Sequence, residues 1–489
     1  YIAKTADELE PTERVIKIAG LFATFKNPDK ETVLTPWRVV NLHLSDTIGG
    51  YDFYDESHNA LLDNPRCVEQ GTITKNIFND KSKILEINSK TGLYPLYMCY
   101  SLFREHIAHK QNLSFEEDQK IWDFIVENQI FVICKTPMAK RITKRTLLGY
   151  RKGKSNMHAF DDLIMQMTEK PDKLIEKIES NNFWNIGGNG KMRFNAVVGN
   201  PPYQVETAKQ QSETNGQARR KSIFQYFQMA ADGMNADYVS LIYPGARWIH
   251  RSGKGMSTFG LEQINDKKLV KLEFYPNSQD IFNGISIDDG ISIVLKSKAK
   301  ASKEFEYVYH ENGLATSVCL KNPGEELIPL NPANASIVKK VTEFVEENNL
   351  KYIFDRVLSQ KLFGVESSFI EDNPGKSKPY KKNIIIDYSK EVKLFTNDKA
   401  GPAGRSQWFV VDKDLIPTNR HYIDEWQVVV SSAHPGGQAG RDNQLEIIDN
   451  HSAFGRARVA IGSFKSQTEA ENYYKYIQSN IIKFMFLMT

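Results

Sequence analysis

Short apolar runs alternate with helix-like segments through most of the first 335 residues. Strand-like runs occur within residues 82–106, 121–137, 192–203, 236–245 and 268–276. The first two segments also contain apolar residues at the three-to-four-residue spacing of an amphipathic helix. Strands that alternate with helices favour an α/β fold, in which helices cover a mostly parallel sheet.

Two further segments refine this picture. Residues 284–298, GISIDDGISIVLKSK, contain two short strand-like runs around an Asp-Gly turn, which predicts a hairpin and an antiparallel strand in the sheet. Residues 11–50 read as helical, and Thr35 and Pro36 precede the periodic stretch WRVVNLHL. Proline suits the first turn of a helix, so we expect a helix to begin there.

The character of the chain changes near residue 335. A helix is predicted at 335–350, short strands with Gly, Pro and Asn turns at about 350–465, and an amphipathic helix at 466–487. A chain of 489 residues is too long for one ordinary core. We therefore expect two domains, 1–335 and 336–489, the second of mixed α+β type.

Composition narrows the class of protein. The chain is 40% hydrophobic and 25% charged, which excludes disorder as its main state. A net charge of +3 means that any contact with nucleic acid must use local basic patches. The four cysteines show no metal-ligand spacing, so we expect no metal site and reduced thiols in a cytoplasmic protein. No apolar run approaches the roughly 18 residues that span a bilayer.

The stretch VVGNPPY contains the strongest chemical signal. A strand-like run ends at Gly199 and is followed by Asn200, Pro201, Pro202 and Tyr203. Adjacent prolines exclude a helix interior and a central strand, and they hold the preceding residue extended, so that Asn200 projects from a rigid turn. A plain stiff turn and a peptide-docking motif are alternative interpretations.

The chemical interpretation of this elbow involves a nucleobase amine. Such an amine is a poor nucleophile because its lone pair is delocalised into the ring. The Asn200 amide oxygen and the Pro201 carbonyl could both accept its hydrogens and aim the lone pair at an electrophile. Tyr203 would supply an aromatic face for a base flipped out of the duplex.

The elbow resembles the catalytic motif of S-adenosylmethionine-dependent amino-methyltransferases, most of all the DNA adenine methyltransferases. Residues 33–44, 84–98, 238–249 and 281–298 resemble other segments of this family. More narrowly, the chain resembles the methylase and target-recognition portion of type IIG fused restriction–modification enzymes. The resemblance implies a Rossmann-like class I methyltransferase sheet in 1–335, base flipping, and a target-recognition domain in 336–489 that binds double-stranded DNA.

The chain opens at Tyr1, without methionine, on a charged helical lead-in that covers residues 1–30. We expect that it was cut from a longer chain. The resemblance adds that an endonuclease domain could lie upstream of Tyr1.

The same resemblance implies which residues hold S-adenosylmethionine. They are Thr35, Pro36, Glu86, Asn88, Gly92, Cys134 and Asp162. Two positions depart from the family pattern, because Lys90 replaces a glycine of the cofactor turn and Cys134 replaces a carboxylate that holds the ribose. A thiol cannot accept two strong hydrogen bonds from a diol. A catalytically inactive, sequence-reading module is therefore an alternative, and a protein-glutamine methyltransferase with the same elbow is another.

Basic, amide and aromatic side chains interleave with turns after residue 350. Arg, Gln and Asn pair with base edges, and Lys suits phosphates. Together with the elbow, this pattern predicts DNA contacts at Lys361, Lys378, Lys381, Arg405, Gln407, Trp408, Arg441, Arg456 and Arg458.

Overall fold

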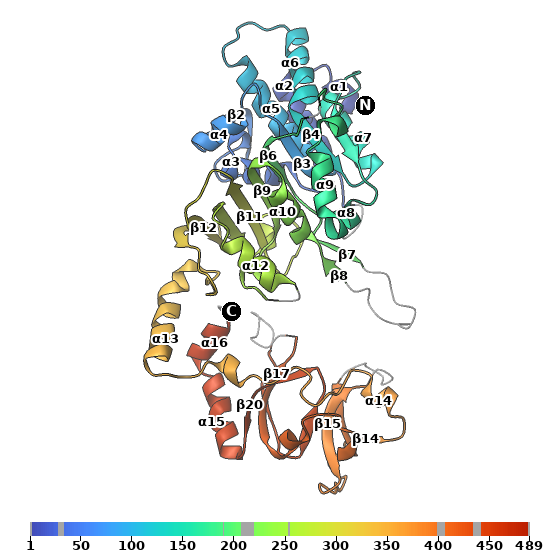
Figure 1. The fold of residues 1–489 in the computed structure, drawn as a ribbon, viewed down its shortest axis with the longest axis vertical. Helices are drawn as coiled ribbons and strands as arrows, with labels where there is room; N and C mark the ends of the chain where they lie inside the picture. Colours follow the sequence, from blue (N-terminus) through green and yellow to red (C-terminus); the bar gives the residue numbers. More distant parts are fainter. Residues whose placement is uncertain are drawn as a thin grey trace. The chain divides into compact units, whose positions relative to one another are not determined.

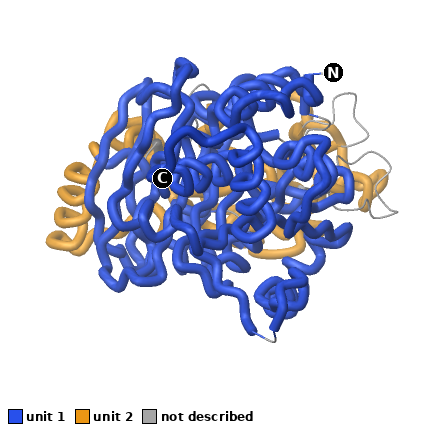
Figure 2. The backbone as a smooth tube through the Cα atoms, turned by 90° about the horizontal axis from the view of Figure 1, so that it is seen from above, with its two compact units in different colours: residues 1–332 blue, residues 333–489 orange. Residues whose placement is uncertain are grey.

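The protein forms two compact units, Tyr1–Pro332 and Ala333–Thr489, which Figure 2 distinguishes by colour. The computed structural model describes residues 2–27, 34–188, 190–206, 220–252, 255–398, 406–433 and 442–487.

A nine-stranded sheet organises the described part of the first unit (Figure 1), in the order β13-β12-β10-β11-β9-β6-β3-β4-β5. Its strands are β3 (Ile84–Ser89), β4 (Ile130–Cys134), β5 (Asn156–Ala159), β6 (Phe194–Gly199), β9 (Ala236–Pro244), β10 (Leu269–Tyr275), β11 (Ile291–Ser297), β12 (Glu304–Glu311) and β13 (Leu314–Lys321). Strands β5, β4, β3, β6 and β9 are mutually parallel, whereas β11 runs antiparallel to β9 and β10. The predicted mostly parallel α/β sheet with an antiparallel strand is confirmed.

Helices cover both faces of this sheet. One face packs against α2 (Pro11–Ala23), α3 (Trp37–Thr47), α5 (Leu93–Ile107), α6 (Phe115–Asn128) and α7 (Pro137–Leu148). The other face packs against α8 (Leu163–Glu169), α9 (Pro171–Ile178), α10 (Phe224–Gly233) and α12 (Met256–Ile264). Ile84 and Ala196 belong to the first core, and their neighbours Leu85 and Val197 belong to the second. This alternation explains why the strands read as continuous apolar runs.

Smaller elements complete the first unit. They are α1 (Ile2–Ala6), the antiparallel pair β1 (Gly50–Tyr54) and β2 (Leu61–Val68), α4 (Thr72–Ile77), the pair β7 (Gln204–Glu206) and β8 (Arg220–Ser222), and α11 (Ala246–Ile249). Sequence analysis predicted neither the β1–β2 pair nor the β12–β13 pair.

The hairpin predicted within residues 284–298 is wrong. Only β11 forms there, and its antiparallel neighbours are β9 and β10. The Ser278 hydroxyl donates to the Ile285 carbonyl (3.0 Å) and accepts from the Ile287 N–H (2.8 Å). These side-chain bonds occupy backbone groups that a hairpin strand would have paired, while Ile285 and Ile287 pack against the core.

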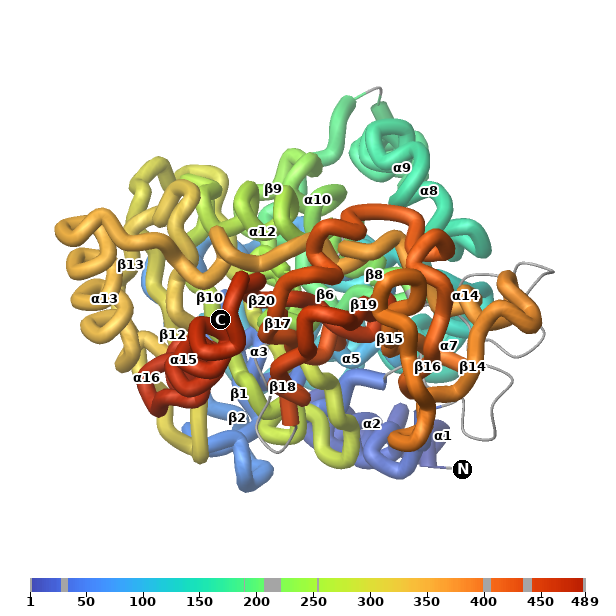
Figure 3. Tube along the Cα trace, turned by 90° about the horizontal axis from the view of Figure 1, so that it is seen from below, coloured from blue at the N-terminus to red at the C-terminus, as the bar shows by residue number. Residues whose placement is uncertain are grey.

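The described part of the second unit combines helices with two small sheets, whose strands are labelled along the chain in Figure 3. Its elements are α13 (Ala335–Glu347), α14 (Phe369–Asp372), β14 (Ser377–Pro379), β15 (Glu391–Asn397), β16 (Ser406–Asp412), β17 (Trp426–Ser431), β18 (Glu446–Ile448), β19 (Ser452–Phe454), β20 (Arg458–Phe464), α15 (Gln467–Ile477) and α16 (Asn480–Leu487). The sheet orders are β14-β16-β15-β19 and β18-β17-β20. The last two helices lie where sequence analysis predicted a single helix. The Ser479 N–H bonds to the Tyr476 carbonyl and closes α15.

The carboxyl ends of the central strands β3 and β6 approach each other closely. A Cβ atom on Gly199, the last residue of β6, would lie 2.7 Å from the Ile87 carbonyl oxygen, and the φ of Gly199 is +152°. Only glycine therefore permits this approach without a shift of the backbone. Because of this close contact, the segment that follows β6 begins beside the end of β3.

We predict that Gly199→Ala lowers the melting temperature of the first unit by about 5–10 °C, since strain of this kind costs about 2–3 kcal/mol. Differential scanning calorimetry of the full chain measures this change. Gly187→Ala is the matched control, because no atom lies within 4 Å of its added Cβ. Equal melting temperatures for the two variants would contradict the proposed close approach.

Candidate active site

The strand order places a switch point between β3 and β6. From β3 the chain proceeds through α5 to β4 and then to β5 on one side, whereas β6 leads through α10 to β9 on the other. In open parallel sheets, ligands bind beyond the carboxyl ends of the strands at such a point. The cofactor turn predicted after β3 and the elbow predicted after β6 both lie there.

The elbow is compact and largely enclosed. Asn200 is 3% exposed, Pro201 and Pro202 are buried, and Tyr203 is half-buried. Tyr203 packs against both apolar cores, and burial raises the pKa of its phenol well above the usual range, although a hydrogen bond with Asn200 opposes this shift. The elbow is thus a rigid corner whose polar groups face one another.

Two other segments hold Asn200 in place. The Asn88 side chain donates to the Asn200 carbonyl (3.1 Å), which ties the turn after β3 to the elbow after β6. The Asn200 amide lies 3.0 Å from the Thr35 hydroxyl, just before α3. Asn88 has a φ of +77°, a conformation that Asn tolerates better than most residues. Three predicted site residues from distant parts of the sequence therefore converge.

Glu86 has the most unusual titratable side chain of this site. Its side chain is buried, and its Oε2 atom has no hydrogen-bond partner among the described residues. Burial raises the pKa of this carboxyl to about 8, and a hydrogen bond from Ser89 and the charge of Lys90 oppose the shift only in part. A buried acceptor without a partner costs free energy, so a cationic or N–H-bearing ligand would be bound favourably here.

The remaining predicted cofactor residues have different surroundings. Gly92 begins α5 with a φ of +82°, and a Cβ there would lie 3.0 Å from the Thr143 Cα, so this glycine permits α5 to pack against α7. Cys134 is buried at the end of β4, where burial raises the pKa of its thiol to about 12. Asp162 is exposed at the start of α8, and its carboxylate accepts from Gln166 at 2.6 Å.

A cavity of about 610 Å³ lies beside Thr35, the residue that contacts the Asn200 amide. Residues Thr35, Pro36, Arg38, Thr91, Leu93 and Phe282 contribute to its lining. Thr35 both lines this cavity and contacts Asn200. Its volume falls in the range of small-molecule and cofactor sites. Sequence analysis did not predict Leu93 or Phe282, because apolar lining residues carry no local chemical signal.

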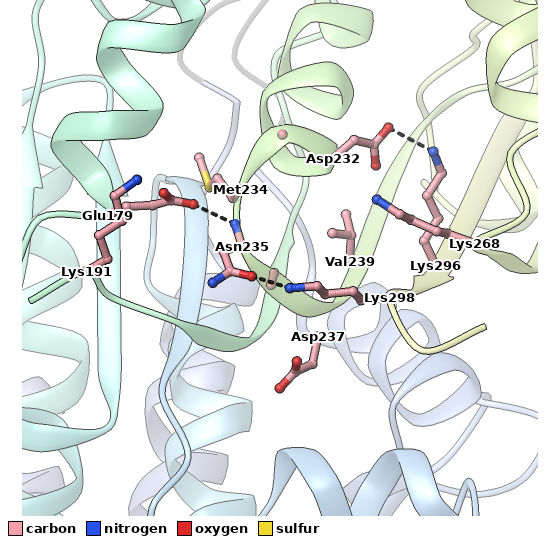
Figure 4. A pocket seen from close by; sticks show the side chains of 12 residues that line it. Glu179, Lys191, Asp232, Met234, Asn235, Asp237, Val239, Lys268, Lys296 and Lys298 are labelled. Carbon is pink, nitrogen blue, oxygen red and sulfur yellow. Dashed lines mark hydrogen bonds and ion pairs between the residues drawn. The ribbon is translucent and has the colours of Figure 1, made fainter. Parts of the chain in front are cut away.

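A second cavity, of about 380 Å³, lies at the start of β9, away from the elbow (Figure 4). Lys296 pairs there with Asp232 and Asp266, each at 2.8 Å. The Glu179 carboxylate accepts from the Asn235 N–H at 2.6 Å. The buried charges of this cavity are therefore satisfied within the protein, unlike Glu86 at the switch point.

The predicted DNA-contacting residues have varied environments in the second unit. Lys361 and Arg456 both pair with Glu366, Lys378 lies 3.9 Å from Glu391, and Lys381 is exposed. The Gln407 amide donates to Asp398 at 2.8 Å, and the Trp408 ring packs beside Phe395. Arg405 and Arg441 lie outside the described residues.

Arg458 requires a correction. It is 8% exposed, its guanidinium donates to Glu446 (2.9 Å) and to Gln444, and it lies over the Phe395 ring. Because these internal partners occupy the guanidinium, the structure gives Arg458 a role inside the unit, and we omit it from the proposed DNA contacts.

Comparisons with known proteins find similarity to methylases. The family described as Eco57I restriction-modification methylase matches residues 128–282, a range that includes the elbow. A relative from Mycoplasma pneumoniae, described as an uncharacterized adenine-specific methylase, is 29% identical over 102 residues, which make up 21% of this chain and 23% of the relative. The resemblance to restriction–modification methylases that the motifs predicted is thus confirmed.

Solved structures show more distant similarity. A DNA-bound type ISP restriction-modification enzyme, LlaBIII, has a TM-score of 0.49 and 11% identity, covering 92% of this chain and 35% of that one. A modification subunit of a putative type I restriction enzyme from Vibrio vulnificus has a TM-score of 0.38 and 13% identity, covering 63% and 54%. At these TM-scores, neither similarity bears on function. In the described ranges, no helix is both long and apolar enough to cross a membrane.

We predict that Glu86→Gln removes a pH dependence of stability. The folded pKa of about 8 lies above the ordinary value of 4.5, so the folded protein binds more protons than the unfolded chain between these values. Stability of the ligand-free protein should therefore fall as pH rises from 5 to 8, and the variant should lack this component.

Melting temperatures of both proteins from pH 5 to 9 measure the effect. The melting temperature of the variant minus that of the wild type should be several degrees larger at pH 8–9 than at pH 5. Glu127→Gln, on the exposed side of α6, is the control. A difference between wild type and Glu86→Gln that stays constant with pH would contradict the assignment.

Proposed function

We propose that this chain is an S-adenosylmethionine-dependent DNA methyltransferase that modifies the exocyclic amine of a flipped adenine. The observation that carries the proposal is the hydrogen-bonded junction of Asn88 and Asn200 at the switch point. Thr35 links this junction to a cavity, and the unsatisfied buried carboxyl of Glu86 precedes Asn88 by two residues. The match to restriction–modification methylases and the adenine-specific relative support the same reaction class.

The elbow would act on the base. The Asn200 amide oxygen and the Pro201 carbonyl would accept the two hydrogens of the amine, which favours a nitrogen lone pair directed out of the ring plane. The Tyr203 ring would stack on the flipped base and compensate for stacking lost in the duplex. Pro201 and Pro202 keep these groups in place because their φ angles are fixed.

The residues predicted to hold the cofactor suit the positively charged part of S-adenosylmethionine. This group supplies an electrophilic methyl on a positively charged sulfur and also carries an ammonium. Glu86, which has a buried acceptor without a partner, would release its proton and balance a positive charge. Thr35 and Pro36, which line the cavity, would border the group together with Asn88, which bonds to Asn200. Gly92 would permit the turn to approach it, whereas the neutral Cys134 thiol would give a weaker contact to the ribose than a carboxylate gives.

The second unit would recognise the DNA sequence, as part of a restriction–modification enzyme of type IIG character in the cytoplasm. Exposed Lys381 and the weakly paired Lys378 suit phosphate contacts, and Gln407 suits a base edge. Arg405 and Arg441 remain candidates from sequence alone. An upstream endonuclease in the same longer chain belongs to this proposal.

One observation favours a second function. Cys134 stands where the family has a carboxylate, and its thiol is held neutral by burial. A chain that had lost cofactor binding in this way would be a non-catalytic, sequence-reading DNA module. A protein-glutamine methyltransferase would share the elbow but would label protein instead of DNA.

We predict that the full chain transfers tritium-labelled methyl groups from S-adenosylmethionine to unmethylated genomic DNA, and that Asn200→Ala lowers the rate by at least about 100-fold. DNA binding should change little. Asn128→Ala, whose amide donates to its own helix, is the control. Label in a protein extract instead of DNA would identify a protein methyltransferase, and binding without label would identify the non-catalytic module.

We predict that Lys381→Gln reduces the salt dependence of DNA binding. Loss of one phosphate contact should lower the slope of log K against log salt concentration by about 1 and weaken specific and non-specific DNA alike. Fluorescence anisotropy at several salt concentrations measures this. Lys154→Gln, an exposed lysine of the first unit, removes the same charge as a control. Equal slopes for the two variants would contradict the assignment.

A further inference from the structure

The two ends of the Asn200 carboxamide have different surroundings. One end faces the Thr35 hydroxyl at 3.0 Å. The other end lies 3.2 Å from the Ile242 carbonyl, 3.3 Å from the Pro201 carbonyl and 3.0 Å from the Tyr203 hydroxyl. Three oxygen atoms therefore surround one end of a buried amide, and a single hydroxyl contacts the other.

This arrangement allows two orientations of the amide, which exchange its nitrogen and oxygen. In the first, the nitrogen donates to the carbonyl and phenol oxygens, and the oxygen accepts from Thr35. Both ends of the amide then have hydrogen-bond partners. The oxygen that the methylation mechanism requires points away from the Pro201 carbonyl, so this orientation is a resting state.

In the second orientation the nitrogen donates to the Thr35 hydroxyl, and the amide oxygen lies beside the Pro201 carbonyl. The two oxygens form the acceptor pair that an exocyclic amine needs. Without such an amine, the oxygen of a residue that is 3% exposed faces the Pro201 and Ile242 carbonyls and relies on the Tyr203 hydroxyl as a donor, which is costly. An entering amine supplies the missing hydrogens.

A hydroxyl is suited to both orientations because it can donate and accept. The terminal torsion of asparagine is broad and roughly two-fold, so the exchange needs no backbone movement. We propose that Thr35 is the positioning residue of Asn200: its hydroxyl holds the amide in a resting and in a reactive orientation, and the adenine amine selects the reactive one. This inference rests on the proposed function, and it gives Thr35 a role in positioning the group that binds the reacting base.

The same arrangement discriminates between bases. A base that presents an amine satisfies the acceptor pair. A base that presents a carbonyl oxygen at that position adds a further acceptor, and the amide then keeps its resting orientation. The Thr35–Asn200 pair would therefore favour amino-bearing bases over keto bases at the step after flipping.

The test compares Thr35→Val, which keeps the shape but removes the hydroxyl, with Thr35→Ser, which retains it. The full chain is assayed with labelled S-adenosylmethionine and unmethylated genomic DNA, both at saturation, and affinities for each are measured separately. Thr168→Val is a matched control, because the Thr168 hydroxyl donates within its own helix. Thermal melting verifies folding, and Thr35→Ala replaces the valine variant if that variant does not fold.

We expect Thr35→Val to lower the methylation rate at saturation by about 10- to 100-fold, with less than about 3-fold change in either affinity. Thr35→Ser should recover most of the rate. A wild-type rate in Thr35→Val, or a change confined to cofactor affinity, would overturn the inference while the active wild type upholds the proposed function. A wild-type chain that labels no DNA would overturn both.

Discussion

The closeness of the carboxyl ends of β3 and β6 is the constraint on which the site depends. Gly199 allows β6 to pass the Ile87 carbonyl at a distance that no side chain would permit. This proximity lets Asn88 reach across and bond to the Asn200 carbonyl. The turn after β3 and the elbow after β6 therefore form one hydrogen-bonded unit, and the two prolines after Asn200 make that unit rigid.

Much of the first unit follows from local sequence because its strands are buried on both faces and read as continuous apolar runs. The elements that sequence analysis predicted wrongly or missed also have local causes. Ser278 forms side-chain bonds that replace the hairpin expected before β11. The β12–β13 pair continues the sheet beyond β10. Its outer strand, Leu314–Lys321, is largely exposed, and its apolar and polar residues alternate only weakly, so the sequence did not reveal it.

The site was predictable in its residue types but not in its contacts. The elbow is visible in the sequence because adjacent prolines restrict the backbone so strongly. Thr35 was visible only as a cofactor residue, because its contact with Asn200 joins positions 165 residues apart. Arg458 illustrates the opposite error, since an arginine beside glycines looks like a base-reading residue until its buried partners Glu446 and Gln444 are known.

Two groups at the switch point, the Glu86 carboxyl and the acceptors of Asn200 and Pro201, are suited to ligands of different chemistry. Glu86 has a buried oxygen that seeks a positive charge or a donor, and Asn200 with Pro201 can form an acceptor pair that seeks an amine. Native proteins leave few buried polar groups without partners, so the unpaired oxygen of Glu86 requires an explanation beyond stability. In the function proposed above, a cationic methyl donor would pair with the Glu86 carboxyl, and an extruded adenine would supply hydrogens to the acceptor pair. Asn88 follows Glu86 by two residues and bonds to the Asn200 carbonyl. In the proposed function, a cofactor that orders the turn after β3 would therefore also restrict the elbow, and would lower the ordering cost of binding the base.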